Sequence, residues 1–146
     1  MSRAAQNEAA KIAALQQALA AEQAASYGYG VVGAHLAGAR YLQAAADCVA
    51  HDRARDRLTR LLIALGATPR AAAVAYKLPV TVSTKADAVL LAITLEGEVM
   101  AAYLDLVPAA DPALRIVAAT GMQDAAIRAA GWGGYPQAFP GFAAAH

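Results

Sequence analysis

Two stretches of helical spacing each carry a glutamate at a position where the pattern calls for an apolar side chain. Steps of three and four residues place Glu22 in one apolar seam and Glu96 in another. A carboxylate on a core-facing seam is costly unless a partner neutralises it. We therefore expect two helices that face each other across a polar centre. The seams are Ile12, Leu15, Leu19, Glu22, Ser26, Tyr29, Gly33, Leu36 and Val89, Ile93, Glu96, Met100, Tyr103, Val107.

The composition favours an all-α fold in a single domain, residues 1–146. Hydrophobic residues make up 59% of the chain and alanine is abundant, which is typical of helical proteins. A formal net charge of +1 with scattered basic residues argues against nucleic acid as a partner. Every long apolar stretch is interrupted before it reaches membrane-spanning length, and the N-terminus lacks an export signal. We therefore expect a cytoplasmic protein with no membrane partner.

Capping signals divide the chain into four helices. Gly38 and Gly66 are placed to close the first two helices in the left-handed conformation. Thr84 and Asp87 have the spacing of a capping box, and Asp111-Pro112 is a cap followed by proline at the first helical position. The helices are expected at residues 7–36, 40–65, 84–107 and 111–131.

The connections between these helices predict the topology. The first and second helices, and the third and fourth, are joined by only a few residues, so each pair should form an antiparallel hairpin. Residues 66–83 contain prolines and a β-favouring Val-Thr-Val segment, so they should cross the bundle in an extended path. One long crossover between two hairpins is the connectivity of a ferritin-like four-helix bundle. Residues 132–146 are expected to form an irregular tail whose aromatic side chains lie against the bundle.

The glycines of the first helix match a nucleotide-binding pattern by chance. Gly28, Gly30 and Gly33 have the spacing G-x-G-x-x-G, but they lie inside a predicted helix with no preceding strand. Glycine in a helix is destabilising, so a packing reason is expected. We predict close packing of a neighbouring helix at these positions, or a small-molecule pocket beside them.

Polar residues on the seams could form either a metal site or a charge-paired cluster. A di-iron bundle needs two Glu-x-x-His pairs, and the sequence contains none. Guanidinium groups can neutralise buried carboxylates instead. We therefore predict a cluster without metal or other cofactor; the alternative is an iron or manganese site formed by Glu22, His51, Glu96 and Asp124. The predicted cluster consists of Glu22, His51, Arg55, Glu96, Asp124 and Arg128.

Several segments together resemble the ferritin-like domain-of-unknown-function family 4439 (DUF4439), which is found largely in actinobacteria. The resemblance implies a ferritin-like four-helix bundle of unknown activity. Members of this family often carry histidine after the glutamate of the first helix, whereas Gln23 occupies that place here, which argues further against a metal role. The similar segments are residues 18–30, 50–55, 76–79, 95–103, 124–128 and 139–141.

The expected function is non-catalytic. We predict a binding or structural protein, expected to be a homodimer, which takes a small-molecule ligand or a protein partner. The alternative is a metal-dependent oxidase or an iron-handling protein. An acid/base pair formed by Glu22 and Glu96 is a third possibility, but the sequence marks no open cleft at their level.

Overall fold

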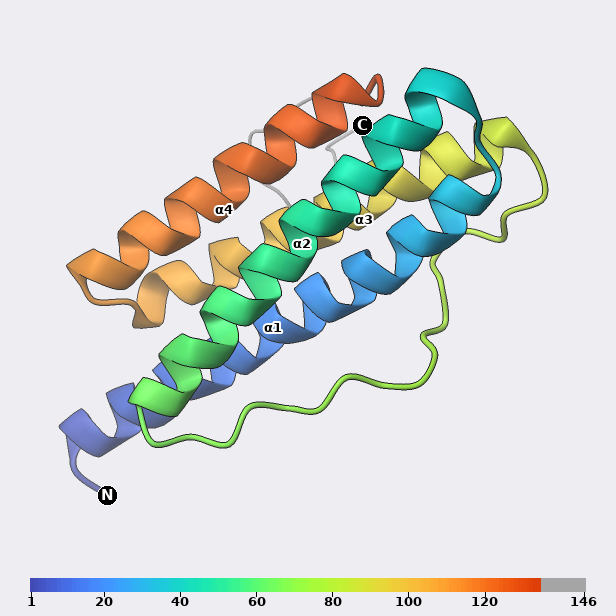
Figure 1. The fold of residues 1–146 in the computed structure, drawn as a ribbon. Coiled ribbons are helices and arrows are strands. Elements are labelled where there is room, and N and C mark those ends of the chain that lie inside the picture. The colour runs from blue at the N-terminus through green and yellow to red at the C-terminus, as the bar shows by residue number, and fades with distance from the viewer. Residues whose placement is uncertain (135–146) are drawn as a thin grey trace.

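The computed structural model describes residues 1–134, which form an all-α bundle of four long helices (Figure 1). A short 3-10 helix, η1, joins the third helix to the fourth. The all-α four-helix fold predicted from the sequence is therefore confirmed. The elements are α1 (Arg3–Ala34), α2 (Gly38–Ala64), α3 (Lys85–Leu106), η1 (Val107–Ala109) and α4 (Pro112–Gly131).

The helix ends follow the capping chemistry in most places. Thr84 and Asp87 form the predicted capping box at the start of α3, and the Asp111 side chain accepts a hydrogen bond from the Leu114 amide at 2.9 Å. Gly66 has a φ of +73°, the left-handed conformation that ends a helix. The predicted start of α1 at Asn7 was wrong. Ser2 caps this helix, because no residue between Ser2 and Asn7 disfavours a helix.

Two antiparallel hairpins and one long crossover define the topology. α1 and α2 form the first hairpin, and α3 and α4 form the second (Figure 1). The crossover runs the length of the bundle on the outside of α1, so α2 and α3 are parallel, as predicted. α1 holds it in place: the Gln16 side chain bonds the backbone of Thr68 and Arg70, and Gln23 bonds the Arg70 carbonyl.

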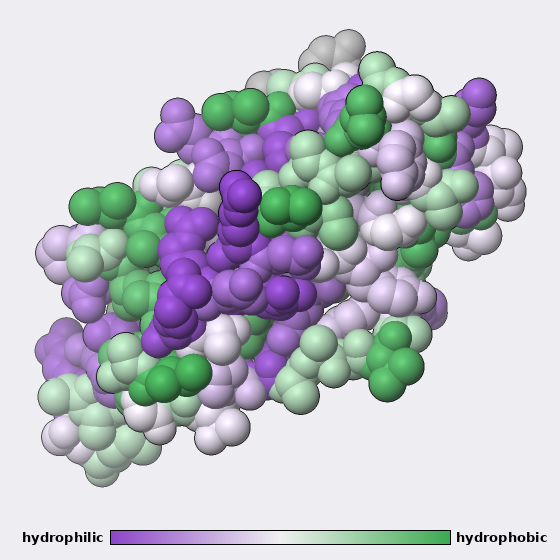
Figure 2. Space-filling view, viewed as in Figure 1, coloured by the Kyte–Doolittle hydropathy of each residue, from purple (hydrophilic) through white to green (hydrophobic). Residues whose placement is uncertain are grey.

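The helices do not all pack on one another equally. Within residues 1–134, the closely packed pairs are α1 with α2, α1 with α3, and α3 with α4. α2 and α4 are therefore the outer helices and face each other without close packing. Figure 2 shows that hydrophilic side chains gather over the middle of α2 on this face.

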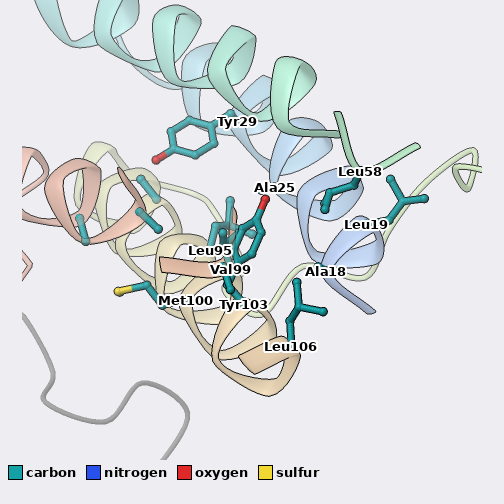
Figure 3. Close-up of a cluster of buried hydrophobic side chains, with 14 of the residues drawn as sticks. Ala18, Leu19, Ala25, Tyr29, Leu58, Leu95, Val99, Met100, Tyr103 and Leu106 are labelled. Carbon is teal, nitrogen blue, oxygen red and sulfur yellow. The ribbon is translucent and has the colours of Figure 1, made fainter. Parts of the chain in front are cut away.

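The apolar core lies mainly where α1 meets α3, and Figure 3 shows part of it. Tyr29 and Tyr103 lie within this core and are almost fully buried. Trp132, just after α4, is 2% exposed and also belongs to it. The rest of the predicted aromatic tail, residues 135–146, lies outside the described residues. Within residues 1–134, no helix combines the length and apolar character that crossing a membrane requires.

Candidate functional site

Three of the residues singled out in the sequence meet in the centre of the bundle. Glu22 on α1, His51 on α2 and Glu96 on α3 are each at most 1% exposed. His51 lies between the two carboxylates: its Nδ1 is 2.6 Å from Glu22 Oε2, and its Nε2 is 3.0 Å from Glu96 Oε1. The imidazole therefore bridges the two glutamates and uses both of its ring nitrogens to do so.

Two tyrosines complete the arrangement, and the sequence interpretation missed them as polar partners. Tyr29 on α1 donates a hydrogen bond to Glu96 on α3 at 2.6 Å. Tyr103 on α3 donates one to Glu22 on α1 at 2.8 Å. Each tyrosine follows a glutamate of its own helix by seven residues but bonds the glutamate of the facing helix. The seam spacing, which places each tyrosine on the same seam as a glutamate, is the sequence signal for this arrangement.

Arg128 on α4 supplies the second positive charge. Its Nε donates to Glu96 Oε1 at 3.0 Å, and its side chain is 16% exposed. Glu96 Oε1 thus accepts hydrogen bonds from Tyr29, His51 and Arg128, whereas Glu96 Oε2 has no partner among the described residues. From here on, the buried polar cluster means Glu22, Tyr29, His51, Glu96, Tyr103 and Arg128.

The electrostatics of the buried polar cluster favour its charged form. Burial acts to lower the pKa of His51, but hydrogen bonds and charge from Glu22 and Glu96 outweigh it and raise the pKa to about 9. Burial acts to raise the pKa of Glu96, but His51 and Arg128 outweigh it and hold that pKa below its usual value. At neutral pH an imidazolium and a guanidinium therefore balance two carboxylates.

The two tyrosines keep their protons. Burial raises the pKa of Tyr29, and the neighbouring Glu96 charge raises it further. Burial and the charge of Glu22 do the same for the pKa of Tyr103. Both hydroxyls therefore act as hydrogen-bond donors to the carboxylates at neutral pH.

An aromatic wall closes one side of the cluster. The ring of Tyr29 stacks on His51 with 5.2 Å between centroids, and Trp132 lies 6.2 Å from Tyr29. Trp132 is held there because its indole N–H donates to Asp47 at 2.8 Å and Arg40 lies over its ring. These side chains separate His51 from solvent on the side of the α4 C-terminus.

Two residues predicted to belong to the cluster lie outside it. Arg55 is 36% exposed and pairs with Asp52 and Asp56 of its own helix. Asp124 is exposed on α4. The helical phase explains both corrections: α2 turns His51, Ala54 and Leu58 inward, and α4 turns Ala118, Ala125 and Ala129 inward.

The residues present do not fit a metal centre of the ferritin-like kind. Within residues 1–134, no group of three or more His, Cys, Asp or Glu side chains is arranged to hold a metal ion. A metal-bound histidine must offer a ring-nitrogen lone pair, but both nitrogens of His51 point at carboxylate oxygens. Arg128 also lies against Glu96, where a cation would have to bind.

The glycines of α1 have different surroundings. A Cβ at Gly28 would lie 2.5 Å from Leu95 Cδ1, so α3 approaches closely there. A Cβ at Gly33 would only reach ordinary contact with Ala44 and Tyr41, and one at Gly30 would meet nothing within 4 Å. Leu95 fills the space beside Gly28 that a ligand would need.

A small cavity instead reaches the buried polar cluster from the space between α2 and α4. Its volume is about 180 Å³. Glu22, Tyr103 and Arg128 line it on the inside, and Arg53 and Arg57 of α2 line it towards the surface. Arg128, whose side chain is 16% exposed, therefore borders this cavity at the side of the bundle between α2 and α4, which we call the open side of the bundle.

The comparisons with known proteins agree with the fold but assign no activity. A family model described as "Domain of unknown function (DUF4439)" matches residues 14–144. The crystal structure of a conserved hypothetical protein, rv2844, from Mycobacterium tuberculosis is similar, with a TM-score of 0.83 and 36% identity. The match covers 86% of this chain and 96% of that chain. No curated protein matches.

Proposed function

This chain belongs to the DUF4439 family of proteins of unknown function, and we propose that it is a non-catalytic binding protein whose polar core is structural and metal-free. The core would hold α1, α2, α3 and α4 in register, and a ligand would bind at the open side of the bundle. The homodimer and the cytoplasmic location expected from the sequence stay predictions.

One observation carries the proposal: both ring nitrogens of His51 lie within hydrogen-bond distance of oxygens of glutamates that are themselves buried. Catalysis by a carboxylate or an imidazole needs a proton that can move to or from a substrate. Here the protons of His51, Tyr29 and Tyr103 are all used within the cluster. The arrangement thus resembles a satisfied core network more closely than an active centre.

Elemental analysis of the full-length protein, purified without chelators, tests this proposal. We expect less than stoichiometric iron, manganese and zinc, and no change in melting temperature when a chelator or one of these ions is added. Stoichiometric metal that is lost in Glu22→Ala and kept in the matched surface variant Glu8→Ala would contradict it. Glu8 lies on the same helix and is partly exposed.

A second candidate, a degenerate iron or manganese site, has one observation in its favour. Glu96 Oε2 is buried without a hydrogen-bond partner in the described chain, and such an atom is costly unless something binds it. A water molecule would satisfy it as well as a cation. The same elemental analysis separates the two, because only the metal site gives stoichiometric iron or manganese.

A further inference from the structure

The open side of the bundle contains two neighbouring cavities between α2 and α4. The first is the cavity beside the buried polar cluster, about 180 Å³, which we call the arginine pocket. The second, about 210 Å³, is called the apolar pocket. The arginine pocket is lined by Glu22, Ala50, Arg53, Ala54, Arg57, Tyr103, Gly121, Asp124 and Arg128. The apolar pocket is lined by Leu61, Ala64, Leu65, Asp111, Ala113, Leu114 and Val117.

The helical register places the two pockets end to end. On α2, residues 50–57 line the first pocket and residues 61–65 line the second, so the lining continues on successive turns of one face. On α4, which runs antiparallel to α2, residues 121–128 and 113–117 follow in the opposite order. The two pockets thus lie in line along the same face of α2 and α4, which we call the α2–α4 groove, and from Arg53 to Leu65 this line follows about 18 Å of helix at about 1.5 Å per residue.

The arginine end of the α2–α4 groove is positively charged, and two of its three arginines form no ion pair within residues 1–134. Arg53 and Arg57 are exposed and form no ion pair within residues 1–134. Arg128 uses only its Nε for Glu96, so its two terminal nitrogens have no bonded partner there. Of the two carboxylates lining this pocket, Glu22 is already bonded to His51 and Tyr103. Since Arg128 is paired with Glu96, this leaves Asp124 against the guanidinium groups of Arg53 and Arg57.

The other end of the groove has the opposite character. Leu61, Leu65, Leu114 and Val117 present apolar side chains there, and Asp111 is the one charged residue in the lining. The carboxylate of Asp111 is already occupied, because it caps α4 and pairs with Lys11. A ligand in this pocket would therefore gain mainly from burial of apolar surface.

We propose that the α2–α4 groove binds a single-chain amphiphile with an anionic head, such as an alkyl carboxylate. The head would pair with Arg53, Arg57 and the free nitrogens of Arg128, since guanidinium binds carboxylate and phosphate oxygens in a bidentate manner. The alkyl chain would extend along the groove into the apolar pocket. This inference rests on the proposed binding function and names its site and the class of its ligand.

Charge and shape together select this occupant over others. A polar anion alone would leave the apolar pocket unfilled, and an uncharged alkane would leave the guanidinium groups of Arg53 and Arg57 unpaired. A cation is disfavoured by the net positive charge of the arginine pocket. The two cavities, of about 180 and 210 Å³, lie in line and would take the head and the tail of one extended chain.

Isothermal titration calorimetry of the full-length, metal-free protein tests the inference with four probes. Dodecanoate is compared with acetate, which has the same head, and with dodecyltrimethylammonium and dodecyl phosphate, which have the same chain. Dodecanoate is expected to bind, and acetate and dodecyltrimethylammonium are expected to bind at least ten-fold more weakly. Dodecyl phosphate distinguishes a carboxylate head from a phosphate head: tighter binding than dodecanoate would assign the natural ligand to the phosphate class, within the same inference.

Matched variants locate the site. Arg53→Gln combined with Arg57→Gln should raise the Kd for dodecanoate at least ten-fold, whereas Arg60→Gln, an exposed arginine of the same helix outside both pockets, should leave it unchanged. Val117→Asp should weaken binding to a similar extent. Its control is Ile116→Asp, because Ile116 is 69% exposed and lines neither pocket.

Three results would overturn the inference. One is the absence of dodecanoate binding by folded protein, and another is equal binding of dodecyltrimethylammonium. The third is a dimer, seen by analytical ultracentrifugation, that Val117→Asp dissociates and Ile116→Asp does not, since a second copy would then occupy the groove. None of these results depends on the metal content of the protein. A failure of this inference is therefore distinguishable from a failure of the proposal that the core is metal-free.

Discussion

The buried polar cluster and the α2–α4 groove use the same kinds of charged residue in opposite ways. In the cluster, two carboxylates are met by an imidazolium, a guanidinium and two tyrosine hydroxyls, all within 3.0 Å. In the groove, Arg53 and Arg57 have no carboxylate within ion-pair distance in the described chain. Arg128 belongs to both regions, with its Nε in the cluster and its terminal nitrogens towards the groove.

Solvent explains the difference. A charge that is 0–1% exposed must find its partners inside the protein, because leaving it alone costs several kcal/mol. An exposed guanidinium is solvated by water and tolerates the lack of a partner at little cost. Pairing in the first region is therefore required by folding, whereas the free arginines of the second region remain available to a ligand.

Removing the central cation should have the largest effect. His51→Leu leaves two buried carboxylates facing each other, so we expect a loss of about 3–5 kcal/mol in the free energy of unfolding, measured by urea denaturation. Arg55→Gln is the control and should change stability by less than about 0.5 kcal/mol, because Arg55 forms only surface pairs. Equal effects of the two variants would show that buried and exposed charges do not differ in their contribution to folding.

Alkaline pH should weaken the same contact without a mutation. The raised pKa of His51 means that its stabilising contribution is complete below the unfolded value of 6.5 and is lost as pH rises through about 9. At about 1.4 kcal/mol per pKa unit, this loss amounts to about 3 kcal/mol. The lowered pKa of Glu96 adds a contribution that is present above 4.5 and is lost as pH falls.

Stability should therefore be highest between about pH 5 and 6.5. Urea denaturation at several pH values checks this, with His51→Leu as the control that should lack most of the alkaline decline. A wild-type stability that does not change between pH 6.5 and 9 would show that the folded pKa of His51 is not raised.

Removing single tyrosine hydroxyls should have a smaller effect. Tyr29→Phe and Tyr103→Phe each take one donor from a buried carboxylate, and we expect each to cost about 1.5–3 kcal/mol. Tyr27→Phe is the matched control on α1, because Tyr27 is 37% exposed and its hydroxyl has no bonded partner in the described chain. A Tyr27 variant as destabilised as the other two would show that the hydroxyls are not acting through the cluster.

Gly121 allows the boundary between the two regions to be tested. A Cβ there would lie 2.6 Å from the Tyr103 ring, so Gly121→Ala should displace the tyrosine and cost about 1–3 kcal/mol. Gly30→Ala, which meets nothing within 4 Å, should instead stabilise the protein by about 0.5–1 kcal/mol. Thermal denaturation of the two variants should give shifts of opposite sign; shifts of the same sign would contradict the contact.

Much of the fold could be predicted because helix ends depend on local chemistry. The Thr84–Asp87 capping box and the Asp111 cap require only neighbouring residues, and both lie where the sequence placed them. The burial of Glu22 and Glu96 also followed from spacing, since a seam is a property of one helix. The start of α1 was misplaced because two acceptable caps, Ser2 and Asn7, lie close together and the sequence between them suits a helix.

The partners of the buried acids were harder to predict, because they depend on how the helices rotate against one another. Arg55 and Arg128 look equivalent in sequence, yet Arg55 finds Asp52 and Asp56 on its own helix while Arg128 reaches Glu96. Asp124 lies on the seam by spacing but faces the groove. The tyrosines were overlooked since a buried tyrosine is compatible with packing alone.

The protonation of His51 tests the central claim most directly, namely that its imidazolium neutralises the two buried glutamates. Proton–nitrogen NMR correlation of the imidazole ring near neutral pH can count the protons on Nδ1 and Nε2. We expect both nitrogens to carry protons, and we expect their resonances not to change when iron(II) or manganese(II) is added. A neutral ring whose unprotonated nitrogen responds to stoichiometric metal would contradict it.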